Sequence, residues 1–539
     1  MATRNEPAVL TVQGNWEELF GNERSALERI LPDYLRPRRW FGGKTKDIRS
    51  VTLKHVIPIP SSISTVFYNL VQVGYVDGAL DQYAVPLTFA SGAHAQNVLD
   101  NSPHAVAARL EGGTNGILVD ALAEASFGSV LLEAIGNNRT LSTSQGEMRA
   151  RALGNDAAIR GSIPLSAMIG RAEQSHTSII FGDKLILKCF RRLEEGENPD
   201  LEIGSFLTRV GFPHSAAVAG AIEFRHSLGR EPITLAILHN FVPNQGDAWT
   251  YALKELGEYY KTLRAARASQ PDLPLGHLLD LAKKGTPGPA CDYLGRDAMR
   301  SALILGERTA ELHLALAKGR DPAFAPEPFS AQVQQALHQS LSDLHGRVFA
   351  LLRSRFVDLP ESVQEEARGV LERSDVISGR LERILQSPLT SQRIRCHGDY
   401  HLGQVLYTGQ DFVIIDFEGE PARPLAERRR KASPLRDVAG MIRSFHYAAH
   451  CGLPPDIPAL QPWAEFWYSW ISGQFLCAYL ATAGYGTVAP ASRQELQLLL
   501  DTFLLEKAMY ELNYELNHRP DWVRIPLRGI GHLLDSTSS

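Results

Sequence analysis

Residues 395–421, RCHGDYHLGQVLYTGQDFVIIDFEGEP, form the segment that most constrains how this chain can fold. Two short apolar runs, VLY and FVII, flank the turn-forming sequence TGQD, which predicts a strand, a tight turn and a second strand. The polar residues before the first run place His397, Asp399 and Gln404 in a turn, and Asp416 stands where the second run ends. The segment therefore predicts a compact strand-turn-strand unit flanked by acidic and amide side chains.

These side chains have the spacing of a phosphoryl-transfer centre. In kinase-like phosphotransferases a catalytic-loop Asp accepts the proton of the attacking hydroxyl, and an amide or carboxylate shortly after it helps to hold a metal ion. A further Asp follows a short strand and binds the Mg²⁺ that bridges the nucleotide phosphates. We therefore predict a catalytic pair of Asp399 and His397, and metal ligands at Gln404, Asp416 and Glu418.

Each of these residues also has an ordinary structural interpretation. Asp399 could cap a helix, Asp416 could end a strand in a turn, and His397 could be a buried core histidine. All of them together at kinase spacing are much rarer than any one alone, so the catalytic interpretation is favoured. Glu418 replaces the glycine of the protein-kinase sequence DFG, which favours a small-molecule kinase.

Residues 170–204 supply candidates for nucleotide binding. A kinase requires a strand Lys that contacts the α- and β-phosphates and pairs with a helix Glu, and Lys188 in LILKCF and Glu202 on a predicted helix fit. The turn before them lacks GxGxxG, so we expect Ser175, Thr177 and Ser178 to cradle the phosphates with hydroxyls and backbone amides. The alternatives are an exposed strand Lys, a surface Glu and hydroxyls that serve only a local turn.

The pattern of apolar residues divides the chain into three parts. Alternating β-rich runs dominate residues 1–130, short strands with one helix occupy 131–245, and long amphipathic helical runs fill 246–539 around the strand-turn-strand unit. A chain of 539 residues is long enough for two or three domains. The predicted fold class is α+β.

Composition excludes several classes of protein. The 44% hydrophobic and 21% charged fractions are those of an ordinary globular protein. A net charge of -5 without a long basic tail gives no general attraction to nucleic acid or to an anionic membrane. The 5 cysteines lack CxxC spacing, which argues against a disulfide framework or a zinc cluster of that kind and fits a reducing cytosol. Since we find neither a signal-peptide core nor an apolar run of about 18 residues, we expect a cytoplasmic protein.

The helical run LLEKAMYELNYELNHRPDW is the candidate for the acceptor site. Its residues Lys507, Tyr510, Glu511 and Tyr514 recur at i, i+3, i+4 and i+7 and therefore share one helix face. A sugar ring presents apolar CH faces and directional hydroxyls, so aromatic and charged side chains together suit a sugar groove. The alternative is that both tyrosines are core residues and that the charged residues are solvated.

The chain resembles the bacterial maltokinases, which occur alone or fused to trehalose synthase. The resemblance spans about residues 38–523 and is carried by RRWFGGK, AEQSHTSIIFGDKLILKCFRRLEEGENPDLEIG, FVPNQGDAW, HGDYHLGQ, IDFEGEP, ERRRKASPLRDVAGM and YELNYELNHRPDW. It implies a protein-kinase-like two-lobe fold of the aminoglycoside phosphotransferase type with an N-terminal cap subdomain. It also implies ATP and Mg²⁺ as cofactors and phosphorylation of maltose at its anomeric hydroxyl.

The resemblance implies roles for individual residues as well. Asp399 is similar to the catalytic base, Gln404 and Asp416 to the metal ligands, and Lys188 with Glu202 to the ion pair of the nucleotide lobe. The implied product, maltose 1-phosphate, would feed an α-1,4-glucan maltosyltransferase and hence α-glucan (glycogen) synthesis from trehalose and maltose. The chain has no amylase-like trehalose synthase domain, so an association with a separate trehalose synthase is a further expectation.

Two other function classes remain open at this point. The same catalytic residues serve kinases of other sugars or aminosugars, such as glucosamine, and aminoglycoside-type phosphotransferases; only the acceptor pocket separates these. A non-catalytic pseudokinase that binds glycan is the other alternative, and the intact Lys188, Asp399 and Asp416 argue against it. A nucleic-acid partner is not expected, because the basic run ERRRKASPLRD is short and lacks interleaved aromatic residues.

Overall fold

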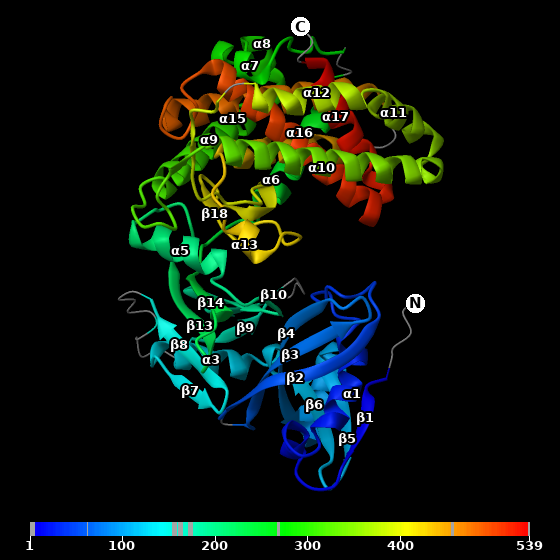
Figure 1. Cartoon of the computed structure of the whole chain (residues 1–539), viewed down its shortest axis with the longest axis vertical. Coiled ribbons are helices and arrows are strands. Elements are labelled where there is room, and N and C mark those ends of the chain that lie inside the picture. Colours follow the sequence, from blue (N-terminus) through cyan, green and yellow to red (C-terminus); the bar gives the residue numbers. More distant parts are fainter. Residues whose placement is uncertain are drawn as a thin grey trace. The chain divides into compact units, whose positions relative to one another are not determined.

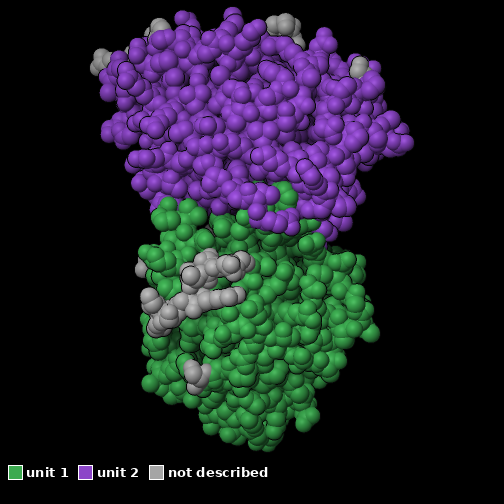
Figure 2. Space-filling model, turned by 90° about the vertical axis from the view of Figure 1, so that its left-hand side faces the viewer, with its two compact units in different colours: residues 1–208, 216–243 green, residues 209–215, 244–539 purple. Residues whose placement is uncertain are grey.

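The structure is a computed structural model that describes residues 6–61, 63–153, 159, 165–170, 176–266, 270–386, 388–453 and 458–536. It divides into two compact units, one made of residues 1–208 and 216–243 and the other of residues 209–215 and 244–539 (Figure 1, Figure 2). The finer boundaries predicted from the sequence, near 130 and 245, stay predictions. None of the helices in the described ranges combines the length and the apolar character that crossing a membrane requires.

The first sheet of the first unit lies between two hydrophobic cores. Among the described residues its strand order is β1-β5-β6-β4-β3-β2, with β12 paired to β4. Successive side chains of a strand point to opposite faces, so Val71 and Val73 enter one core, whereas Tyr68 and Leu70 enter the other. Because both faces of β3 are buried, its sequence is an almost continuous apolar run. The strands are β1 (Ala8–Val12), β2 (Ile48–Ile59), β3 (Val66–Tyr75), β4 (Leu80–Ala90), β5 (Val106–Gly112), β6 (Gly116–Asp120) and β12 (Arg192–Leu193).

The second sheet carries the predicted nucleotide-binding strand. In the described part of the chain its order is β7-β8-β13-β14-β11-β10-β9, so the strand that contains Lys188 lies inside the sheet. Its strands are β7 (Thr140–Thr143), β8 (Gly146–Ala152), β9 (Ala167–Ile169), β10 (His176–Phe181), β11 (Leu185–Phe190), β13 (Val218–His226) and β14 (Ile233–Asn240). The helices of the first unit are α1 (Arg24–Leu35), α2 (Gly92–Asn101), α3 (Ala125–Gly136) and α5 (Pro199–Arg209).

Arg191 connects the two sheets. It follows β11 directly, and its buried guanidinium forms an ion pair with Asp120 at 2.8 Å. The Tyr34 hydroxyl donates to the same carboxylate at 2.9 Å, and the Trp40 ring centroid lies 5.1 Å from the guanidinium carbon. Trp40 of the segment RRWFGGK therefore packs on Arg191, and the burial of Trp40 and Phe41 is what a packing role requires.

We predict that Asp120→Ala lowers the free energy of unfolding of the first unit by about 3–5 kcal/mol, because it leaves the buried Arg191 charge without its counter-ion. Urea unfolding followed by tryptophan fluorescence measures this. Asp183→Ala is the matched control, since Asp183 is 80% exposed on a turn and should be neutral. A loss for Asp120→Ala no larger than that of the control would show that the ion pair does not stabilise the unit.

The second unit is mostly helical. At its centre α15 is buried on nearly every side, with Trp463, Trp467, Phe475 and Tyr479 in the core, and it packs against α9, α7 and α14. Figure 1 shows α10 running beside α16, which it contacts. The helices are α6 (Ala248–Ala265), α7 (Leu278–Lys284), α8 (Gly288–Leu294), α9 (Arg296–Leu316), α10 (Ala331–Arg355), α11 (Glu361–Glu372), α12 (Ser374–Glu382), α13 (Leu425–Arg428), α14 (Leu435–Cys451), α15 (Gln461–Ala483), α16 (Arg493–His518) and α17 (Arg524–Ser536).

The predicted strand-turn-strand unit is present among these helices. It consists of β17 (Val405–Tyr407) and β18 (Phe412–Ile414), paired antiparallel with Val405 opposite Ile414. The short strands β15 (Glu327–Pro328) and β16 (Gln392–Arg393) pair with each other. The β-rich first unit and the helical second unit confirm the predicted α+β class.

Candidate active site

The turn that carries Asp399 is fixed through its backbone by Asp437, in the first turn of α14. The carboxylate of Asp437 accepts hydrogen bonds from the backbone N–H groups of His397 at 2.7 Å and Gly398 at 3.0 Å. His313 Nε2 lies 3.1 Å from the same carboxylate. Burial alone would raise the pKa of Asp437, but the contacts with His313 and the turn outweigh it and lower the pKa. An ionised buried carboxylate thus holds the turn.

Two glycines allow this close packing. Gly398 has a φ of 85°, in the left-handed region that glycine adopts without strain. Gly440 faces the turn from α14, and a Cβ added there would lie 2.6 Å from the Tyr400 carbonyl oxygen. The Tyr400 hydroxyl in turn lies 2.9 Å from Thr309 Oγ1, which ties the turn to α9. A larger residue at either glycine would displace the turn.

His397 is buried beneath this turn. Its Nε2 lies 2.9 Å from the carbonyl oxygen of Ile415, the residue before Asp416. Its ring packs against Tyr400 and Phe417, with centroids 5.2 and 5.0 Å away. These contacts join the turn of Asp399 to the end of β18 and support a positioning role. Direct participation of His397 in catalysis stays a prediction.

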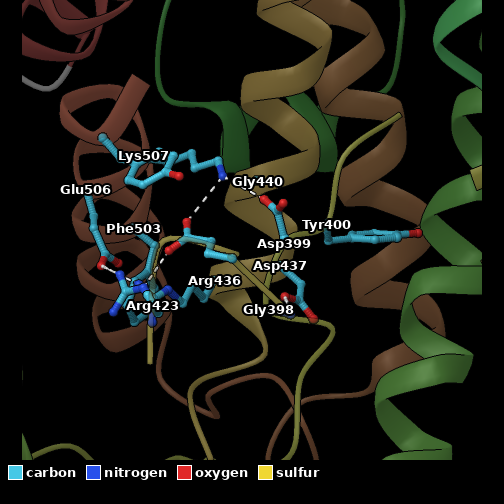
Figure 3. Close-up of a pocket in the computed structure, with 12 residues that line it drawn as sticks. Gly398, Asp399, Tyr400, Arg423, Arg436, Asp437, Gly440, Phe503, Glu506 and Lys507 are labelled. Carbon is cyan, nitrogen blue, oxygen red and sulfur yellow. Dashed lines mark hydrogen bonds and ion pairs between the residues drawn. The ribbon is translucent and has the colours of Figure 1, made fainter. Parts of the chain in front are cut away.

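Asp399 faces a charged pocket in the second unit (Figure 3). Lys507, from α16, points toward it, with Nζ 3.1 Å from Asp399 Oδ1 and 3.4 Å from Glu420 Oε1 (Figure 3). Burial alone would lower the pKa of Lys507, but the negative charges of Asp399 and Glu420 outweigh it, so the pKa is raised. The lysine is therefore a permanent positive charge beside the predicted base.

Two arginines neutralise the remaining acids of the pocket. Arg423 pairs with Glu420 and, at 3.3 Å, with Glu506, which also pairs with Arg436. Burial opposes ionisation of Glu420, but Lys507 and the two arginines hold its pKa at about 2. Glu420, Glu506 and Arg423 were not identified as site residues from the sequence. The lining residues are Gly398, Asp399, Tyr400, Glu420, Arg423, Arg436, Asp437, Gly440, Phe503, Glu506, Lys507 and Tyr510.

The predicted metal ligands Gln404 and Asp416 stand at the same end of the β17/β18 hairpin. The N–H of Ile415 donates to the Gln404 carbonyl at 3.0 Å, which brings Gln404 beside the start of the Asp416 segment. Asp416 has a φ of 68°, an uncommon value for a residue other than glycine and one that often marks a functional position. The carboxylates of Asp416 and Glu418 lie within 4.8 Å of each other. These oxygen donors fit Mg²⁺, so Gln404, Asp416 and Glu418 remain its predicted ligands.

The four residues predicted on the acceptor helix have different surroundings. Lys507 and Tyr510 line the pocket with Asp399, and Lys507 Nζ lies 4.8 Å from the Tyr510 ring centroid. Glu511 instead accepts from Arg443 of α14 at 3.0 and 2.6 Å. Tyr514 is 41% exposed, and its ring stacks on His518. The exposure of Tyr514 also rules out the alternative that it is a core residue.

In the first unit Lys188 contacts the carboxylate of Asp200, which was not predicted from the sequence. Its Nζ lies 2.9 Å from Asp200 Oδ2, and both side chains are buried. Asp200 and Glu202 both stand in the first turn of α5. The predicted pairing of Lys188 with Glu202 stays a prediction.

The predicted phosphate-cradling hydroxyls lie on and before β10. Ser178 is directly opposite Lys188 in the β10/β11 pairing. The Thr177 hydroxyl accepts from Arg191 Nε at 2.9 Å, so it takes part in the packing around Arg191. Ser175 lies outside the described residues. A phosphate-binding role for all three residues stays a prediction.

We predict that Asp437→Ala lowers kcat by about 10²-fold, because a catalytic group that shifts by about 1 Å can lose that much. KM for ATP should change little, since Asp437 acts on the turn of Asp399 through His397 and Gly398 and is not itself a predicted nucleotide-binding residue. Steady-state kinetics with circular dichroism checks both effects in folded protein. Asp375→Ala, at an exposed position of α12, is the control. A folded Asp437→Ala variant with normal kcat would show that the turn keeps its geometry without this carboxylate.

Two protein-family profiles match the chain. The Maltokinase N-terminal cap domain matches residues 34–123, and the Phosphotransferase enzyme family matches residues 245–446. The first match contains the RRWFGGK segment, and the second contains the turn of Asp399, the hairpin and Asp437.

Curated relatives match most of the chain at low identity. A "Glucosamine kinase" of Streptacidiphilus jiangxiensis is 24% identical over 391 residues, which are 70% of this chain and 76% of the relative. A "Glucosamine kinase" of Mycolicibacterium smegmatis is 25% identical over 389 residues, 70% of this chain and 81% of the relative.

Solved structures have the same fold. A "Glucosamine kinase in complex with glucosamine, ADP and inorganic phosphate" has a TM-score of 0.59 and 19% identity, covering 97% of this chain and 100% of that chain. A second glucosamine kinase structure, crystal form B, has a TM-score of 0.60 and 20% identity, covering 96% of this chain and 99% of that chain. The kinase-like fold predicted from the sequence is confirmed, as is the maltokinase-type cap. The chain is therefore a phosphotransferase enzyme that carries a maltokinase N-terminal cap domain.

Proposed function

We propose that the protein transfers the γ-phosphoryl group of ATP to the anomeric hydroxyl of maltose and so forms maltose 1-phosphate. The observation that carries this proposal is the maltokinase cap at residues 34–123 in the same chain as a phosphotransferase domain at 245–446. ATP as the donor is supported by the kinase-like turn and hairpin and by the solved glucosamine kinase that is in complex with ADP.

The proposed reaction assigns a task to each group. Asp399 accepts the proton of the attacking sugar hydroxyl, and Asp437 keeps the turn of Asp399 in position. Lys507, at 3.1 Å from Asp399, supplies positive charge where negative charge develops during transfer. Mg²⁺, held by Gln404, Asp416 and Glu418, would neutralise the nucleotide phosphates. Lys188 would contact the α- and β-phosphates.

The charges of the pocket favour a neutral acceptor. Every carboxylate in its lining already has a cationic or N–H partner: Asp399 and Glu420 contact Lys507, Glu506 contacts Arg423 and Arg436, and Asp437 holds the turn. An amino sugar would carry a positive charge close to three cationic side chains without an unpaired carboxylate to receive it. A sugar that offers only hydroxyls needs no such partner.

A glucosamine kinase is the second candidate. The observation that favours it is the similarity to the two curated relatives, both of which are glucosamine kinases. Binding of an aminosugar would require Glu420 or Glu506 to exchange an arginine for the substrate ammonium group. This difference makes the identity of the acceptor a direct test of the proposed pocket chemistry.

Product analysis tests the proposal. Protein incubated with maltose, ATP and Mg²⁺ should form a phosphate ester whose phosphorus couples to the anomeric proton in NMR spectra. The reducing end should disappear in step with ADP release, because the phosphate blocks the anomeric carbon. A phosphate ester that retains the reducing end would place the phosphate on another hydroxyl, and ADP release without any ester would mean hydrolysis of ATP; either result would contradict the proposal.

We predict that Tyr510→Ala raises KM for maltose roughly 10-fold while leaving KM for ATP nearly unchanged, because one ligand contact is worth about 1–3 kcal/mol. Tyr514→Ala, one turn further along α16, is the comparison because Tyr514 does not line the pocket. The sequence-based proposal that Tyr514 and Glu511 also contact the sugar would be supported by an equal rise in KM for Tyr514→Ala. An unchanged KM for maltose in Tyr510→Ala would remove this helix from the acceptor site.

The proposed product has a chemical consequence. A phosphate on an anomeric carbon is a good leaving group, so an enzyme that transfers the maltosyl unit to a glucan could consume it in glycogen synthesis. Association with a trehalose synthase stays a prediction that rests on the fused maltokinases.

A further inference from the structure

A histidine pair on α14 lies outside the pocket of Asp399. His446 and His450 are one turn apart near the C-terminal end of this helix, and Glu465 of α15 faces them. One ligand atom from each of the three side chains lies within 4.8 Å of the others. His532 of α17 lies outside this group of three but next to it, with Nδ1 3.7 Å from Glu465 Oε2. Two helices thus bring two imidazoles and one carboxylate together, and a third helix places another imidazole beside the carboxylate.

The ring nitrogens of His446 are unsatisfied in the described part of the chain. His446 is completely buried, and neither of its ring nitrogens has a hydrogen-bond partner among the described residues. Buried imidazole nitrogens are normally hydrogen-bonded, since burying a polar group without a partner costs about 1–3 kcal/mol. Glu465 Oε2 is also buried without a hydrogen-bond donor in the same residues. A cation bound between one ring nitrogen of His446 and the carboxylate of Glu465 would give each of these two groups a partner.

The spacing of the ligand atoms suits a small transition-metal ion. His450 Nε2 lies 3.0 Å and His446 Nε2 4.0 Å from Glu465 Oε1. Zinc binds nitrogen and oxygen at about 2.0–2.2 Å, so the ligand atoms of a tetrahedral site lie about 3.4 Å apart. The observed separations bracket this value. Two histidines at i and i+4 on one helix face are also a common zinc-binding arrangement.

The surrounding charges leave Glu465 available for a cation. Arg443 pairs with Glu511, and Arg528 pairs with Glu366 at 2.9 Å, so each nearby guanidinium has a carboxylate of its own. A metal ion would therefore not compete with these arginines for the carboxylate of Glu465.

We infer that His446, His450 and Glu465, with His532 beside them, form a structural binding site for one zinc-class divalent ion. Imidazole nitrogens beside one carboxylate suit Zn²⁺ rather than Mg²⁺, which prefers oxygen ligands. His532, with 37% of its side chain exposed, gives the ion a path from solvent. The ion would join α14, α15 and α17. It would also fix the far end of the helix whose first turn carries Asp437.

Zinc titration of the full chain tests this site. The protein is treated with EDTA, exchanged into buffer with excess Mg²⁺ to fill oxygen-ligand sites, and titrated with Zn²⁺ in a calorimeter without nucleotide. One equivalent should bind, and His446→Gln, His450→Gln and Glu465→Gln should each weaken binding at least about 100-fold. His104→Gln, at an exposed position in the first unit, and Asp416→Asn should leave the affinity unchanged.

Two further measurements extend the titration, and the first of them needs no variant. Co²⁺ in place of Zn²⁺ should give wild-type protein the intense visible absorption of a tetrahedral site, and one equivalent of Zn²⁺ should remove it. Zn²⁺ should also raise the thermal midpoint of the wild type by several degrees and leave that of Glu465→Gln unchanged. Wild-type protein that binds no stoichiometric Zn²⁺, or binds it equally well without His446 or His450, would overturn the inference.

Discussion

Asp399→Asn should lower turnover by about 10²-fold or more while leaving ATP binding nearly intact. The reason is that the substitution removes the group proposed to accept the sugar proton but keeps its shape. The backbone of the turn is held by Asp437, which this change does not touch. Single-turnover phosphoryl transfer and calorimetric ATP binding measure the two quantities separately.

The loss of the Lys507 ion pair must be separated from the loss of the base. Glu420→Gln is the matched control, because it removes the other carboxylate that contacts Lys507 and leaves Asp399 in place. Its turnover should fall much less than that of Asp399→Asn. Equal losses in the two variants would mean that the charge near Lys507, and not a base at Asp399, accounts for the effect. Nearly normal turnover in Asp399→Asn would remove Asp399 from the base role.

Asp416→Ala should abolish measurable activity and remove the Mg²⁺ dependence of ATP binding. The proposed metal bridges the nucleotide phosphates, so ATP affinity with Mg²⁺ should fall to the affinity without it. Alanine is strained at the left-handed φ of 68°. Asp416→Asn is therefore the better variant, because Asn tolerates this conformation and differs mainly in charge.

Calorimetric titration of ATP with and without Mg²⁺ tests both substitutions. Asp399→Asn is a suitable control, since it should keep the Mg²⁺ dependence that Asp416→Asn loses. If ATP affinity still depends on Mg²⁺ in folded Asp416→Asn, the metal is held elsewhere, and Gln404 and Glu418 lose their proposed role as well.

The features that could be predicted from the sequence are local ones. The hairpin β17/β18 follows from two apolar runs around a turn sequence, and the β-rich cap follows from alternating apolar residues. The turn of Asp399 was recognised because phosphoryl transfer requires particular residue types at short, fixed spacing. Neither inference needs knowledge of which helices touch.

The features that were missed depend on contacts between distant segments. Asp437 of α14 contacts His313 of α9. The contact of Lys507 with Asp399 depends on the packing of α16 beside the turn. Periodicity placed Lys507 and Glu511 on one helix face, but that face is wide, and Arg443 of α14 draws Glu511 into a separate ion pair. Of the four residues predicted on this face, helix packing therefore places Lys507 and Tyr510 in the lining of the pocket.

The sequence also could not show which carboxylate pairs with Lys188. Asp200 and Glu202 both follow the start of α5, where acidic residues are favourable in any helix. Residues two positions apart on a helix point in different directions, and the sequence does not tell which of them faces the strand. The short contact of Lys188 with Asp200 was therefore not predictable from composition or order alone.

The acceptor specificity is the most direct test of the proposed function. The measurement is kcat/KM from sugar-dependent ADP release with maltose, glucose, glucosamine and trehalose as acceptors. The charge pairing in the pocket and the maltokinase cap predict the highest value for maltose and a low value for glucosamine. A value for glucosamine that exceeds the value for maltose would contradict the proposal.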